Sequence, residues 1–286
     1  MRGPGFGRHM GEVMAVTKSI VVCADDFAVN QSASLGIASL AGLGRISATS
    51  AMVLSPRWAG DVALLQPLRG RIDVGLHLDW TSEFAVEAGH GLPLGAAMRR
   101  AVMGGFDRAQ AEAVIERQLD LFEHYWQAPP DYVDGHQHVQ QFAGVRQALM
   151  VALLRRYGTR PVKPYLRISR APLGAADLKS RVIAWMGANA LEKIAKNDGF
   201  KSAAALSGIY DFTGSQARYA TLMSRWLVQA PPGSIIMCHP AQTAEPGDEI
   251  GLARAQEFAY LASNEFPAAV RQSAVRLLRG TDLFTL

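Results

Sequence analysis

VVCADDF, residues Val21 to Phe27, is an apolar run that ends on two adjacent carboxylates. The run has the length and β-branched content of a buried strand, and Asn30 to Gly44 after it has the apolar spacing of a helix. Two like charges at one strand end repel each other, so one of them should have a shifted pKa unless a cation lies beside them. The stretch therefore predicts a strand–helix unit with a positive group at the end of its strand.

Short apolar runs alternate with helical patterns along the rest of the chain. RIDVGLHL (71–78) and GSIIMCHP (233–240) have strand character, and Asp107 to Trp126 has helical spacing with Asp107 as its N-cap. Such alternation implies a parallel sheet with right-handed crossovers. Roughly seven units in one chain favour an α/β fold of the irregular, TIM-like (β/α) barrel type, with a doubly wound open sheet as the alternative. Residues 80–106, rich in glycine and small side chains, are expected to form a long loop or lid.

The composition indicates one large domain. The chain has 286 residues, of which 49% are hydrophobic and 19% charged, enough to bury a large core. Residues 1–18 have no continuous apolar segment and are expected to be a flexible leader, so that residues 19–286 form the domain. Two cysteines exclude a disulfide scaffold.

The charge pattern restricts the partners. A formal net charge of +4 without a long Lys/Arg cluster argues against nucleic acid as a partner. No apolar run approaches the ~20 residues that a transmembrane helix needs. A cytoplasmic protein is therefore the default expectation.

Polar side chains follow the predicted strands at the points where these strands end. Most of the seven histidines fall at such ends. In a parallel barrel the carboxyl ends of the strands open onto one shared site, so we expect these side chains to converge. They are Asp25, Asp26, His77, Asp134, His136, His138, Arg167 and His239.

This set of side chains predicts a divalent metal ion. Imidazole and carboxylate are the usual ligands of zinc and its neighbours, and a catalytic site often has three protein ligands and one open position. The ion would supply the positive charge that the paired aspartates require, and the second aspartate would lie beside a water molecule as its proton acceptor. Zinc is favoured, with magnesium, manganese, cobalt and nickel as alternatives. His136 and His138, two residues apart on an extended strand, should face one side.

Four motifs together resemble a known family. ADDF, GLHL, DGHQHV and MCHPA occur in this order and resemble the YdjC-like carbohydrate deacetylases, which include the chito-oligosaccharide deacetylases and a hopanoid-associated branch. The resemblance runs from about Ser19 to the C-terminus and implies a polysaccharide-deacetylase-like barrel. It also implies metal-dependent removal of an N-acetyl group from an amino sugar in an oligosaccharide or a glycolipid.

The motifs carry residue roles with them. By resemblance, Asp26 is the metal-binding carboxylate and Asp25 the general base, while His77 and the first histidine of DGHQHV, His136, complete the ligand set. His239 resembles a residue that stabilises or protonates on the far side of the metal.

Further residues are implied to lie at the substrate. These are His138, Arg167 and Asp134. The chain departs from the family pattern at Ala28, where glycine is frequent, and at Gln140, where another histidine is frequent; neither position is a proposed ligand.

Other functions remain open on the sequence alone. One is a non-catalytic sugar-binding protein whose metal is structural, which a closed four-ligand site would indicate. Another is a different metal-dependent sugar enzyme on the same barrel, such as an isomerase. A homodimer is open, and a glycolipid substrate would place the protein at the membrane periphery.

Overall fold

The computed structural model describes residues 17–174 and 178–284. Most of the expected leader, residues 1–16, lies outside the described residues, and the first strand begins at Lys18, one residue before the expected domain boundary. The strands are β1 Lys18–Phe27, β2 Ala48–Ala51, β3 Asp73–Leu78, β4 Tyr132–Gly135, β5 Tyr165–Leu166, β6 Leu206–Ser207, β7 Ile235–Cys238 and β8 Val275–Leu277.

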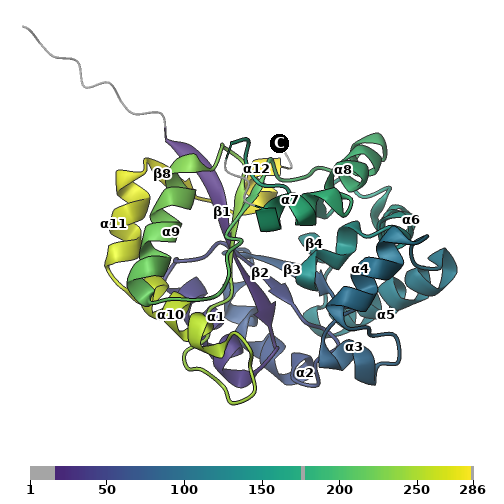
Figure 1. Ribbon diagram of the computed structural model, residues 1–286, viewed down its shortest axis with the longest axis horizontal. Coiled ribbons are helices and arrows are strands. Elements are labelled where there is room, and N and C mark those ends of the chain that lie inside the picture. Colours follow the sequence, from purple (N-terminus) through teal and green to yellow (C-terminus); the bar gives the residue numbers. More distant parts are fainter. Residues whose placement is uncertain (1–16, 175–177, 285–286) are drawn as a thin grey trace, which may run out of the picture.

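Helices follow most of the strands and cover the outside of the sheet (Figure 1). The α-helices are α1 Gln31–Gly42, α2 Trp58–Asp61, α3 Glu83–Glu87, α4 Leu94–Val102, α5 Arg108–Trp126, α6 Val145–Tyr157, α7 Leu178–Trp185, α8 Ala188–Asn197, α9 Gln216–Gln229, α10 Gly251–Ala262, α11 Glu265–Gln272 and α12 Gly280–Phe284. Short 3-10 helices span η1 Val62–Leu64, η2 Gln66–Leu68 and η3 His136–Gln141.

The strands form one parallel sheet in the order β5-β4-β3-β2-β1-β7-β6, with β8 paired to the first residues of β1. The sheet curls until its edges meet, because Leu166 of β5 bonds to the backbone of Lys201 and Ala203, while Ala205 accepts a hydrogen bond from Ile235 of β7. This short seam closes an irregular (β/α) barrel, which confirms the fold class expected from the sequence.

The region between Trp80 and Phe106 is not the long loop that we expected. It contains α3, which Ser82 caps by accepting a hydrogen bond from the backbone of Ala85, and the longer helix α4. Apart from Gly95, which lies inside α4, the glycines that suggested a loop fall between and after these helices, where Gly89, Gly104 and Gly105 have positive φ. The expectation was wrong because these glycines separate helices.

Alternate residues of each strand point into the barrel, and its interior has two levels. The lower level is an apolar cluster that includes Val21 and Cys23 of β1 and the rings of Tyr132 and Tyr165, which stack with their centroids 5.0 Å apart. Gly75 makes room for one ring, because a Cβ there would lie 2.5 Å from Tyr132. The upper level is ionic and forms the base of the site described next.

Candidate active site

The end of β1 explains how two consecutive aspartates face one site. Strand pairing with β2 shifts register between Ala24 and Phe27, as at a β-bulge, and Asp26 has a φ of 65°. A bulge turns a side chain that would otherwise point away from the barrel. Ala28 also has a positive φ, 73°, which is the conformation that glycine adopts most easily.

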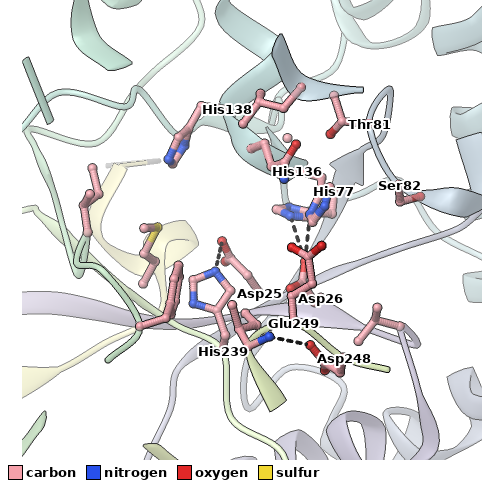
Figure 2. A pocket seen from close by; sticks show the side chains of 18 of the residues that line it. Asp25, Asp26, His77, Thr81, Ser82, His136, His138, His239, Asp248 and Glu249 are labelled. Carbon is pink, nitrogen blue, oxygen red and sulfur yellow. Dashed lines mark hydrogen bonds and ion pairs between the residues drawn. The ribbon is translucent and has the colours of Figure 1, made fainter. Parts of the chain in front are cut away.

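The imidazole rings of His77 and His136 converge on one carboxylate oxygen of Asp26. Oδ1 of Asp26 lies 3.3 Å from Nε2 of His77 and 3.1 Å from Nδ1 of His136. One donor atom from each residue lies within 4.8 Å of the others. Figure 2 shows the two imidazoles pointing at Asp26 from β3 and from the start of η3. The structure therefore brings together the three residues expected to bind the metal.

A second carboxylate orients His77. Its Nδ1 lies 2.6 Å from Oδ1 of Asp134, one strand along, which leaves Nε2 directed at Asp26. A carboxylate in this position commonly fixes the orientation of a metal-binding histidine. Burial alone lowers the pKa of His77, but Asp134 and Asp26 outweigh burial and raise its pKa to about 10. A cation at this point would take the place of the ring proton.

Asp25 belongs to the ionic level inside the barrel. Arg167 donates to both of its oxygens, at 2.5 and 2.8 Å, and its Nη1 also lies 2.9 Å from Asp134. Burial alone raises the pKa of Asp25, but Arg167 and then His77 hold that pKa well below its usual range. Cys23, Asp25 and Asp134 also lie close enough together to hold an ion, but the cation among them is the guanidinium of Arg167.

The direct substrate contacts expected of Arg167 and Asp134 do not fit this arrangement. Both side chains are fully buried, and neither lines the cavity over the site. They lie beneath the site, where Arg167 donates to Asp25 and Asp134 pairs with Nδ1 of His77. Asp134 on β4 and Arg167, directly after β5, are each two residues beyond an interior tyrosine, Tyr132 and Tyr165, and so point to the same interior side.

His239 stands on the other side of Asp25, directly after β7. Its Nε2 lies 3.9 Å from Oδ2 of Asp25, and its backbone N–H donates to Glu257 at 2.5 Å. Figure 2 shows the ring of His239 directed at Asp25. Burial lowers the pKa of His239 to about 4, with Arg254 and Arg167 adding to the effect and the two aspartates opposing it. The ring is therefore neutral near pH 7 and able to receive a proton.

His138 lines the cavity but does not share a strand with His136. β4 ends at Gly135, and both Gln137 and His138 have positive φ inside η3. The expected pair of histidines on one extended strand is therefore wrong. Nδ1 of His138 lies 2.9 Å from the hydroxyl of Ser169, and burial lowers the pKa of His138 to about 3.

Two site residues carried no signal in the sequence, and both lie on α10. Arg254 donates to Oδ2 of Asp26 at 2.7 Å and to Asp248 at 2.8 Å, so it leaves Oδ1 of Asp26 facing the histidines. Glu257, fully buried, accepts from His239 and from the hydroxyl of Tyr210 at 2.7 Å. A pattern of adjacent motifs cannot find them, because they reach the site from a helix far along the chain.

A cavity of about 1340 Å³ lies over these residues. Asp25, Asp26, His77, His136 and His239 line it. Its walls are largely apolar and come from α3, α4, α7, the end of η3, the loop after β6 and the segment 245–250. They include Phe84, Leu94, Met98, Phe142, Leu178, Val182, Tyr210, Phe212 and Ile250. The cavity is large enough to receive a substrate of several rings.

The sequence model of the YdjC-like protein family matches residues 19–272. The chain belongs to the YdjC-like family. A curated relative, the chitooligosaccharide deacetylase of Serratia marcescens, is 26% identical over 238 residues, which cover 78% of this chain and 82% of the relative.

Solved structures support the fold of this YdjC-like chain. A proposed cellobiose-phosphate cleavage protein from Enterococcus faecalis V583 superposes with a TM-score of 0.68 at 17% identity, covering 94% of this chain and 99% of the other. A peptidoglycan N-acetylglucosamine deacetylase superposes with a TM-score of 0.51 at 10% identity, covering 93% and 87%. At these identities the likeness establishes a shared barrel and nothing finer.

Proposed function

We propose that this YdjC-like protein is a metal-dependent carbohydrate N-deacetylase that hydrolyses the acetamide of an N-acetylated amino sugar. The observation that carries the proposal is the separation of two carboxylates at one strand end. Asp26 faces two imidazoles, whereas Asp25 is held apart by Arg167 and faces His239. One carboxylate can bind a cation while its neighbour remains available for a proton.

The donor set fits one divalent ion. Asp26, His77 and His136 offer one carboxylate and two imidazoles from one small cluster, with His77 already oriented by Asp134. Such a set suits zinc best, and three protein ligands leave a position open for water or substrate. A closed four-ligand structural site is not found among the described residues, and this favours catalysis over the non-catalytic sugar-binding alternative. When bound, the ion would polarise the amide carbonyl and lower the pKa of a water molecule.

The protein groups would then move the protons. Asp25, kept ionised by Arg167, accepts the proton of the attacking water as the new C–O bond forms. A carboxylate with a low pKa is a weak base, so the step depends on a water molecule that is itself acidified. Nε2 of His239 lies 3.9 Å from Asp25, a separation that one bridging water molecule would span, so His239 would receive this proton through that water molecule and deliver it to the amine as the C–N bond breaks.

The substrate class rests on the relatives and on the cavity. The Serratia marcescens relative is named for chitooligosaccharides, and the cavity has room for more than one sugar ring. His138 lines the same cavity and is placed to contact the sugar. The substrate would be an N-acetylated oligosaccharide or the acetylated sugar head group of a glycolipid.

The test is acetate release from N-acetylglucosamine oligomers by the metal-loaded protein, with and without a chelator. Asp25→Asn should keep its metal and lose about 10²–10⁴-fold in kcat, because the proton acceptor is gone while the ligands remain. Asp107→Asn, at the distant N-cap of α5, is the matched control and should keep both the bound metal and the kcat of the unaltered protein. Absence of acetate from every acetylated sugar tested, with metal bound at one equivalent, would refute the proposal.

A further inference from the structure

Exposed apolar side chains gather around the mouth of the cavity. On α7, Leu178, Val182 and Trp185 are all exposed, and their spacing places them on one stripe of the helix. Leu178 and Val182 also line the cavity, so the stripe begins at its opening. Leu173, in the turn before α7, is fully exposed.

The wall across the cavity has the same character. Leu94 of α4 lines the cavity and is exposed, and Val102 and Met103 at the end of α4 are exposed as well. Leu94 of α4 therefore lines the same cavity as Leu178 and Val182 of α7. Clustered exposed apolar side chains mark a surface that contacts something other than water.

The charges on these two helices indicate what that partner is. Within Leu94–Val102 the charged residues are Arg99 and Arg100, and within Leu178–Trp185 they are Lys179 and Arg181, so both described helices are basic and carry no acidic residue. Basic side chains beside apolar ones, with a tryptophan at the boundary, are the combination that binds the surface of an anionic bilayer. No described helix is long and apolar enough to cross a membrane, so contact would be with the surface only.

We propose that the rim formed by Leu173, α4 and α7 docks on an anionic lipid bilayer, with the cavity mouth facing the lipid. Trp185 and Leu173 insert at the level of the head groups, and Arg181 and Arg99 contact lipid phosphates. The proposal concerns where the protein binds and is independent of the reaction assigned to the site.

Trp185 provides the measurement. All five tryptophans lie in the described part of the chain; Trp185 is 71% exposed, and the other four are at most 7% exposed. A change in the accessibility of tryptophan to solvent therefore reports on Trp185. Vesicles of phosphatidylcholine mixed with phosphatidylglycerol should shift its emission to shorter wavelength and protect it from acrylamide. Pure phosphatidylcholine should do so weakly, and high salt should reverse the effect. Trp185→Phe should remove the signal.

Sedimentation with the same vesicles tests the surface directly. Leu173→Ser with Trp185→Ser should weaken binding about tenfold or more through lost apolar burial. Arg181→Ser should weaken it about fivefold. Val228→Ser, an equally exposed apolar residue on α9, is the matched control and should bind like the unaltered protein. None of these residues lines the cavity, so acetate release from soluble oligomers should be unchanged in every variant.

Three results would overturn the docking proposal. One is that the unaltered protein does not bind anionic vesicles. Another is that the Leu173/Trp185 double variant co-sediments with these vesicles to the same extent as the control variant. The third is a stable dimer in solution that this double variant dissociates, because the rim would then be an interface between two copies. Each of these results would leave the acetate assay untouched, so failure here is distinguishable from failure of the proposed reaction.

Discussion

Buried aspartates at the two ends of the barrel have pKa values shifted in opposite directions. At the carboxyl end, Asp25 and Asp26 each pair with an arginine, and these cations outweigh burial and keep the pKa of both carboxyls low. At the other end, Asp73 and Asp131 have no ion-pair partner in the described part of the chain. Burial raises the pKa of Asp73 and raises that of Asp131 to about 7, and hydroxyl and backbone donors only partly oppose it.

The difference shows that pairing with a cation, more than burial, decides the charge of an aspartate in this barrel. At the carboxyl end, two buried arginines and three histidines lie close enough to favour the ionised carboxylates. Such an arrangement seldom adds stability by itself, because removing ions from water is costly. Its presence at one end only is what a site for cation binding and proton transfer needs.

The largest effect should come from removing a member of the cluster around Asp26. We expect His77→Ala, His136→Ala and Asp26→Asn to lose bound metal, and kcat to fall by more than about 1,000-fold because carbonyl polarisation is lost. Metal content by mass spectrometry beside acetate release measures both. His124→Ala, an exposed histidine on α5, is the control and should retain both. Full metal content in all three variants would contradict the ligand assignment.

Removing the cation from the carboxyl end should be the next largest effect. Arg167→Met removes the guanidinium that pairs with the buried Asp25 and Asp134 and should lower the free energy of unfolding by about 3–5 kcal/mol. Adding Asp25→Asn to that variant should restore part of the loss. Urea denaturation measures both changes. Arg170→Met, which removes a half-exposed pair with Glu192, should cost only about 0–1 kcal/mol. Equal losses in the two arginine variants would mean that the buried network is not special.

Glu257 should have a smaller effect on catalysis. Because it accepts the backbone N–H of His239, Glu257→Ala should let the histidine shift and lower kcat about tenfold at unchanged KM. Glu257→Gln keeps an acceptor and should lose less than about threefold. Steady-state kinetics on a soluble oligomer separate the two. An alanine variant with raised KM and normal kcat would assign Glu257 to substrate binding instead.

The smallest effect should be at the opposite end. Because the folded pKa of Asp131 is about 7, above the reference value of 3.8, the folded protein binds a proton that the unfolded chain releases between these values. Stability therefore falls as the pH rises through that window. Asp131→Asn should remove this dependence and raise the free energy of unfolding at about pH 8, with no gain at about pH 4. Melting curves at both pH values measure this, and equal changes at both would contradict it.

Much of this arrangement could be predicted because the sequence indicates where each buried strand ends. An apolar run followed by a carboxylate or histidine predicted where Asp25, His77 and His239 would lie, and the barrel rule brought them together. The N-cap of α5, Asp107, was also predicted correctly from side-chain type and position.

Other features depend on packing that a local pattern does not contain. Whether Arg167 faces the cavity or lies beneath Asp25 is decided by its position two residues after the interior Tyr165, directly after β5. The left-handed backbone that separates His138 from His136 is unusual for residues other than glycine. Arg254 and Glu257 reach the site from α10, more than two hundred residues after Asp26, and nothing nearby in the sequence distinguishes them.

The stacked rings of Tyr132 and Tyr165 also fill the interior of the barrel below the site, so that no passage leads out at that end. Gly280, at the start of α12, fits against Tyr165 so closely that a Cβ would lie 2.2 Å from its ring, and the lower end of the barrel is sealed there. Substrate would therefore enter, and products would leave, through the mouth of the cavity at the carboxyl end of the barrel. The released amine has to depart past the next arriving molecule, so accumulated amine should compete with fresh substrate and slow turnover as the reaction proceeds.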